Sequence, residues 1–190
     1  MPNDKSVTRT RIKLVLLLLL VSSPFAGAYV AFYFWKPAGT VNYGELMPTT
    51  IVPLANMQGV SPGAADAIKD KWVLLTVDSG QCEAYCQQKL YLMRQVRLAQ
   101  GKNMDRVARA YVIDGGAMPS DEVMKRLDGA AVFRSAPDVL KALPAVDGLH
   151  AHVYLIDPMG NLVLRYPANP EAKGMIKDFT RLLTVSKLGQ

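Results

Sequence analysis

The sequence predicts an α/β protein in which a mixed sheet carries helices on both faces, preceded by one N-terminal transmembrane helix. Residues 14–35 are 22 consecutive residues without a charge. Residues 72–77 form a continuous apolar run typical of a buried strand, and residues 108–113 (ARAYVI) are interpreted as a second buried strand. Helix-forming segments follow each run, and strands that alternate with helices are typical of a sheet packed between helical layers.

The uncharged segment at 14–35 is long enough to cross about 30 Å of hydrocarbon as a helix. The basic stretch at 1–13 predicts that the N-terminus stays in the cytoplasm, and that the rest of the chain lies in the periplasm of a bacterium, beyond the inner membrane. A cleaved signal peptide is the alternative, because the sequence AGA at 26–28 resembles a cleavage site. The apolar run continues for seven residues beyond Ala28, which favours an uncleaved single-pass anchor.

The positive charge of the chain does not predict nucleic-acid binding. The formal net charge is +6, and half of it lies in residues 1–13. No basic run elsewhere is interleaved with aromatic residues, as a nucleic-acid surface would require. We therefore expect the membrane and proteins as partners, and no nucleic acid.

Residues 36–49 are expected to form an extended linker, and residues 50–190 a single folded domain. Proline and glycine recur between residues 36 and 70, a density that breaks helices and limits strands. A short hairpin is expected where the linker ends. The first buried strand, at 72–77, then leads into a helix over 83–100, which is rich in helix formers and is closed by Gly101.

The second half of the domain follows from the same kinds of pattern. In order, we expect a strand at 108–113, a helix at 120–127 capped by Ser120, a small strand at 131–133, a helix at 137–143, a hairpin at 152–166 that turns at 157–160, and a final helix opened by Asn169 and Pro170. In that last helix Ile176, Phe179, Leu182 and Leu183 share one face, which is expected to pack on the sheet.

The only two cysteines, Cys82 and Cys86, lie where the first strand becomes a helix. If the helix begins at or just before Cys82, the pair lies on one helix face, and Leu90 and Met93 continue that stripe into the core. The two Cα atoms would be roughly 6 Å apart, within the range of a disulfide. The unpaired N–H groups and the dipole of a first turn favour the thiolate of Cys82 more than that of Cys86.

Three roles remain open for this pair of cysteines. A disulfide that closes only three intervening residues removes little entropy from the unfolded chain, so a purely structural bridge is the weakest interpretation. Thiol–disulfide exchange suits a pair in an oxidising compartment outside the cytoplasm. Two thiolates also select soft ions such as Cu(I) or Zn(II), and they then need a third ligand.

The two histidines of the chain, His150 and His152, are the candidates for that third ligand. Both lie near the N-terminal end of a predicted strand, whereas Cys82 follows the C-terminal end of its own strand. If the two strands are antiparallel neighbours, these ends meet. His150 is nearer the loop and is the better candidate; His152 is expected to be a hydrogen-bonded or exposed ring.

The stretches KDKWVLLTVDSGQCEAYC and HAHVYLIDPMGNLVLRY together resemble the Sco family of membrane-anchored, thioredoxin-like proteins, over roughly residues 50–185. The resemblance implies a thioredoxin-like fold and a role in assembling the copper site of cytochrome c oxidase, with an oxidase subunit or another assembly factor as partner. It implies Cu(I) binding by Cys82, Cys86 and His150, or less well His152. It also implies thiol exchange in which Cys82 attacks a partner disulfide and Cys86 resolves the product.

The chain departs from the pattern of these families at three places. Leu149 stands five residues before Tyr154, where Sco proteins have their histidine, so His150 is displaced by one position. Glu83 stands where a proline usually follows the first cysteine, and Ala151 where thioredoxin-like proteins have a cis-proline. Two alternatives therefore stay open: an extracytoplasmic thiol:disulfide oxidoreductase without metal, and a non-catalytic assembly domain that kept a disulfide.

Overall fold

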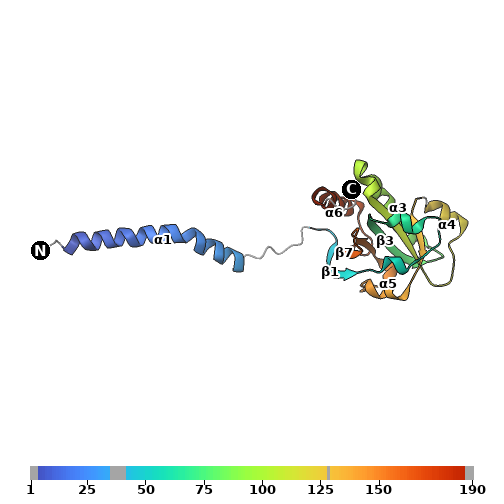
Figure 1. The fold of residues 1–190 in the computed structure, drawn as a ribbon, viewed down its shortest axis with the longest axis horizontal. Helices are drawn as coiled ribbons and strands as arrows, with labels where there is room; N and C mark the ends of the chain where they lie inside the picture. The colour runs from blue at the N-terminus through green and yellow to red at the C-terminus, as the bar shows by residue number, and fades with distance from the viewer. Residues whose placement is uncertain (1–3, 35–41, 128, 187–190) are drawn as a thin grey trace. The chain divides into compact units, whose positions relative to one another are not determined.

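The computed structural model describes residues 4–34, 42–127 and 129–186, and the chain divides into two units, Met1–Thr40 and Val41–Gln190. The first unit contains a single described helix, α1 (Asp4–Phe34), drawn in blue in Figure 1. Within it, Arg11–Phe34 is long and apolar enough to cross a membrane. The predicted N-terminal apolar helix is thus confirmed. Trp35 and residues 36–41, the end of the expected anchor and the start of the expected linker, lie outside the described residues.

The second unit is built on a mixed seven-stranded sheet in the order β1-β7-β6-β3-β4-β5-β2. Strand β3 lies at its centre, parallel to β4 and antiparallel to β6. The strands are β1 (Glu45–Ile51), β2 (Gln58–Gly59), β3 (Trp72–Ser79), β4 (Val107–Asp114), β5 (Ala131–Arg134), β6 (Val153–Ile156) and β7 (Asn161–Arg165). The predicted mixed sheet is confirmed.

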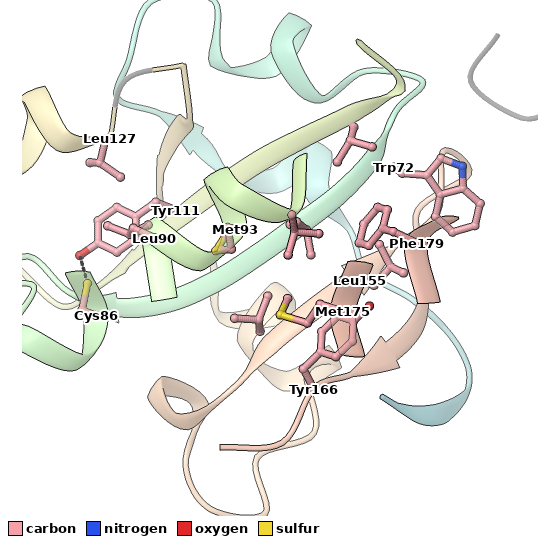
Figure 2. Packing of buried hydrophobic residues seen from close by; sticks show 14 of the residues in the cluster. Trp72, Cys86, Leu90, Met93, Tyr111, Leu127, Leu155, Tyr166, Met175 and Phe179 are labelled. Atoms are coloured by element: carbon pink, nitrogen blue, oxygen red, sulfur yellow. Dashed lines mark hydrogen bonds between the residues drawn. The ribbon is translucent and has the colours of Figure 1, made fainter. Parts of the chain in front are cut away.

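Helices cover both faces of this sheet and enclose two separate hydrophobic cores. One core lies between the sheet and α3 (Ala84–Leu98), α4 (Asp121–Arg126) and α6 (Ala172–Val185), and Figure 2 shows part of it. The other lies between the sheet and α2 (Ala64–Ile68) and α5 (Pro137–Ala142). Alternate residues of β3 point into the two cores: Leu74 into the first, Val73 and Leu75 into the second.

Local details of the helices agree with the sequence patterns. The Ser120 hydroxyl accepts the N–H of Val123 and caps α4, as predicted. Phe179 and Leu183 of α6 are buried in the first core, with Ile176 and Leu182 partly buried beside them. Three short 3₁₀ helices complete the described part of this unit: η1 (Leu54–Asn56), η2 (Gly101–Arg106) and η3 (Leu149–Ala151).

The segment before β3 differs from the expected linker and hairpin. Strand β1 begins at Glu45, inside the range 36–49, and pairs with β7 at one edge of the sheet. Strand β2 pairs with β5 at the opposite edge. Strands β1 and β2 are thus the two edge strands of the sheet and do not pair with each other. The expected short hairpin is therefore wrong.

The pairing of β3 with β6 positions the candidate residues. Because these strands are antiparallel, the C-terminal end of β3 lies beside the N-terminal end of β6, with Thr76 opposite Val153. The cysteines follow β3, and His150 and His152 precede β6. The predicted meeting of these two ends is confirmed.

Candidate functional site

Cys82 and Cys86 form a disulfide, with their Cα atoms 5.0 Å apart. Cys82 is 0% exposed and Cys86 is 2% exposed. Helix α3 begins at Ala84 with Glu83 as its N-cap, one residue after the start predicted at residue 83, so the condition that the helix begins at or just before Cys82 is not met. Cys86, not Cys82, lies in the first turn.

The backbone at Cys82 explains why this residue lies outside the helix. Its φ is 42°, in the left-handed region that few residues other than glycine adopt. The Cys82 N–H donates a 3.1 Å hydrogen bond to the Ser79 carbonyl, which closes a turn after β3. The Gln87 side-chain amide donates to the Cys82 carbonyl at 3.0 Å. The chain thus turns sharply at Cys82 before it enters α3.

Gly80 occupies the same turn because the β4–α4 loop approaches it closely. A Cβ at this position would lie 2.1 Å from the carbonyl oxygen of Ala117 and 2.5 Å from its carbonyl carbon. Only glycine leaves room for this backbone contact. The loop at 115–119 therefore packs directly on the turn that carries Cys82.

The hydroxyl of Tyr111, from β4, points toward the sulfur of Cys86 (Figure 2). It donates a hydrogen bond to the Ser79 carbonyl, the acceptor that Cys82 also uses, and it lies 3.9 Å from Sγ of Cys86. The side chain is fully buried. Burial, and to a smaller extent the negative charge of Asp78, raise the pKa of Tyr111 well above its usual value.

A buried ion pair lies one helical turn beyond Cys86. Lys89 is 0% exposed, and its ammonium donates to Oδ2 of Asp78 at 2.9 Å and to the carbonyl oxygen of His150 at 2.5 Å. Burial lowers the pKa of Lys89, and the hydrogen bond and charge of Asp78 oppose that shift. One cation thus joins α3, the end of β3 and the η3 turn.

The imidazole of His150 faces carboxylates. Its Nε2 lies 3.2 Å from Oδ2 of Asp114, its Nδ1 lies 4.0 Å from Oδ1 of Asp78, and its side chain is 47% exposed. The backbone beside it is fastened to the first turn of α3, because the Tyr85 hydroxyl donates to the Ala151 carbonyl at 2.7 Å. The η3 turn is therefore held next to the cysteine-bearing helix.

His152 is buried and serves as a structural anchor. It is 3% exposed, and its Nδ1 lies 2.8 Å from the carbonyl oxygen of Tyr166. Since a carbonyl oxygen can only accept, Nδ1 carries the proton. The Thr76 hydroxyl donates to the His152 carbonyl. This is the hydrogen-bonded ring that the sequence favours for His152.

The disulfide form of the protein does not gather the predicted Cu(I) ligands. Across residues 4–34, 42–127 and 129–186, no three or more His, Cys, Asp or Glu residues lie together in a way that could hold a metal ion. Both sulfurs are committed to the disulfide, and both ring nitrogens of His150 face carboxylates. Two sulfurs and an imidazole remain a donor set that suits Cu(I), but in this form they do not fit the ion.

Sequence reasoning missed Asp78, Lys89 and Tyr111. Lys89 follows Cys86 by three residues and therefore falls on the buried face of α3, which a lysine rarely occupies without a partner. The sequence does contain a signal for Lys89, because its helical spacing from Cys86 and Met93 places a lysine on the apolar stripe. Asp78 and Tyr111 lie on two strands, β3 and β4, that pair in parallel, and this long-range pairing has no signal in the local sequence.

A family model described as "Transmembrane-like, thioredoxin-like, C-terminal domain" matches residues 72–186. The chain belongs to this family. The match covers β3 to α6 and therefore includes both cysteines, both histidines and the buried ion pair. No curated protein has a sequence that matches this chain.

Solved structures of Sco proteins share the fold. Yeast Sco1 superposes with a TM-score of 0.55 at 11% identity, covering 74% of this chain and 96% of that one. Copper-bound yeast Sco1 gives 0.54 at 11% identity, with 78% and 96% covered. Copper-bound ScoI of Arabidopsis thaliana gives 0.51 at 13% identity, with 75% and 100% covered. The predicted resemblance to Sco proteins is confirmed for the thioredoxin-like fold.

Proposed function

We propose that this chain is a membrane-anchored thiol–disulfide redox protein of the thioredoxin-like type, acting through Cys82 and Cys86. The observation that carries the proposal is the disulfide between these neighbouring cysteines at the start of α3. A bridge over three residues adds little stability, so its value lies in opening and closing. A disulfide is not needed to hold the turn between β3 and α3, because the backbone hydrogen bond from Cys82 to the Ser79 carbonyl already closes it.

The reduced pair performs exchange in two steps. The Cys82 thiolate attacks one sulfur of a partner disulfide, and the other partner sulfur leaves with the electron pair. The Cys86 thiolate then attacks the Cys82 sulfur, releases the reduced partner and leaves the Cys82–Cys86 disulfide. Both cysteines are buried in that product, so a reducing partner must displace part of the surrounding loops before the disulfide can be reduced again.

The location follows from the N-terminal helix and from the redox chemistry together. We propose that α1 anchors the chain in a bacterial inner membrane, with the basic residues 1–13 in the cytoplasm and the thioredoxin-like domain in the periplasm. An oxidising compartment is where a disulfide between neighbouring cysteines persists. The span from α1 to β1 then serves as the linker.

Exchange predicts that a Cys86→Ser variant accumulates covalent complexes. Without Cys86 the mixed disulfide between Cys82 and a partner cannot be resolved, so partners are retained on the full-length chain and are released by reductant. Non-reducing gels of membranes, followed by identification of the released proteins, make the measurement. Cys82→Ser is the matched control and should retain none.

A second outcome of this experiment would contradict the redox proposal. If Cys86→Ser traps no partner beyond the Cys82→Ser background, exchange through Cys82 is not the function. If cells that carry the double variant Cys82→Ser, Cys86→Ser still assemble cytochrome c oxidase, a non-catalytic assembly domain that merely carries a disulfide would then be favoured.

The second candidate function is delivery of Cu(I), as cargo, to the copper site of cytochrome c oxidase, with an oxidase subunit or another assembly factor as partner. Two features favour it. Two sulfurs and one imidazole match the donors that Cu(I) prefers, and the turn that carries His150 is fastened to the cysteine-bearing helix through Tyr85 and Lys89. Copper-bound Sco structures share this fold. Reduction of the disulfide is required first.

Copper binding predicts one Cu(I) for each reduced full-length chain. In detergent, with a competing Cu(I) chelator, His150→Ala should weaken binding by at least about tenfold, the loss typical of removing even an outer-shell partner of a metal. Cys82→Ser should abolish it. The Cys82–Cys86 disulfide should still form in the His150→Ala variant, which separates metal binding from redox activity. No Cu(I) retained by the wild type would contradict the copper proposal and leave the redox proposal standing.

A further inference from the structure

The hydroxyl of Tyr111 is positioned to serve two acceptors, one for each redox state of the cysteines. In the disulfide form it donates to the Ser79 carbonyl, and its oxygen lies 3.9 Å from Sγ of Cys86 (Figure 2). A disulfide sulfur is uncharged and is a weak acceptor, so the carbonyl is the better partner in this state. The close approach to sulfur is therefore not used while the disulfide is intact.

The Ser79 carbonyl does not depend on this hydroxyl alone. It also accepts the N–H of Cys82 at 3.1 Å, so it keeps one hydrogen bond if the hydroxyl turns away. The hydroxyl can turn by rotation of its C–O bond, without movement of the buried ring. An ordinary phenol has a pKa of about 10, so the proton to be donated is present at neutral pH.

Cleavage of the disulfide creates a demand for this donor. When a partner thiolate attacks Sγ of Cys82, the S–S bond breaks and its electron pair goes to Sγ of Cys86. Cys86 is only 2% exposed, so water is not at hand to stabilise its sulfur. A buried anion without a hydrogen-bond donor is costly, and hydrogen bonds to charged groups are the stronger ones.

We propose that the Tyr111 hydroxyl shifts its hydrogen bond from the Ser79 carbonyl to the Cys86 sulfur when the disulfide is reduced, and thereby stabilises the reduced state. This inference rests on the proposed redox function and adds to it a residue from β4, a strand that carries neither cysteine. Tyr111 acts on the sulfur that leaves, and its contribution is to set how readily the disulfide is opened.

The test compares Tyr111→Phe with Tyr154→Phe in the full-length protein in detergent. Tyr154 is also fully buried, but its hydroxyl donates to the Pro144 carbonyl and its ring lies in the other core. Equilibration against dithiothreitol should show that Tyr111→Phe disfavours reduction about tenfold, a fall of about 30 mV in reduction potential for a two-electron couple. Tyr154→Phe should leave the potential unchanged.

A merely structural role for Tyr111 gives a different result. If Tyr111 serves only the Ser79 carbonyl, its loss destabilises either the disulfide form alone or both redox forms equally. The reduction potential would then rise or stay the same, and either outcome overturns the inference. If Tyr111→Phe does not fold, wild-type protein labelled with ¹³C at Cζ of tyrosine provides the second measurement. Reduction should shift the Tyr111 resonance and leave that of Tyr154 in place; no shift at Tyr111 also overturns the inference.

These outcomes are separate from those of the proposed function. The potential and the tyrosine resonance are measured on the protein with a small dithiol, so they report on Tyr111 whether or not Cys86→Ser traps a partner. Absence of trapped partners would refute exchange with proteins while leaving the hydrogen-bond shift intact. An unchanged potential would refute the role of Tyr111 while leaving exchange intact.

Discussion

Replacement of Lys89 by methionine should lower the free energy of unfolding by about 3–5 kcal/mol, the cost of breaking a buried ion pair at one partner. Methionine fills a similar volume, so the loss is mainly electrostatic. The Asp78 carboxylate, in a residue that is 8% exposed, would remain without its cation, and the His150 carbonyl would lose its donor. Denaturant unfolding of the full-length protein in detergent measures the change.

Two further variants separate this cause from packing. Lys102→Met removes an exposed lysine and should change stability by less than about 0.5 kcal/mol. The double variant Lys89→Met, Asp78→Asn removes both charges and should recover most of the loss, because no buried charge is left unpaired. If Lys89→Met alone is as stable as the wild type, the pair does not hold the site together.

Most of the domain could be predicted because its central elements are encoded locally. The run at 72–77 is buried on both faces in β3, and the strands and helices from β4 to α6 each have a periodic or capping signal of their own. The edge of the sheet had no such signal. Strand β1 is largely exposed, contains Pro48 and shifts register between Leu46 and Thr50, as proline in an edge strand allows.

Only part of the site could be predicted from the sequence, because the rest of it has no local signal either. The cysteine pair and its place after a strand follow from neighbouring residues. The left-handed turn at Cys82 depends on the Ser79 carbonyl and on the approach of Ala117 to Gly80, which no local pattern records. Cys82 therefore lies outside the helix, and the Cα separation of the cysteines is 5.0 Å rather than the roughly 6 Å expected if both were on one helix face.

Substitution of Gly80 by alanine should both destabilise the protein and expose the disulfide. The new Cβ would meet the Ala117 carbonyl at 2.1 Å, and since both partners are backbone the loop at 115–119 must move away. Overpacking of this kind costs about 1–3 kcal/mol. Gly80 lies two residues before Cys82, which is 0% exposed in the wild type. Displacement of the loop should therefore uncover the turn that carries Cys82.

The rate at which a water-soluble phosphine reduces the disulfide of the full-length protein measures this exposure. We expect Gly80→Ala to react several-fold faster than the wild type, because local opening becomes easier as the free energy of closing falls; about 1.4 kcal/mol corresponds to a factor of ten. Gly116→Ala is the matched control from the opposing loop, where a Cβ meets nothing within 4 Å. An unchanged rate in Gly80→Ala would mean that the loop does not shield the disulfide, and that partners reach Cys82 by another path.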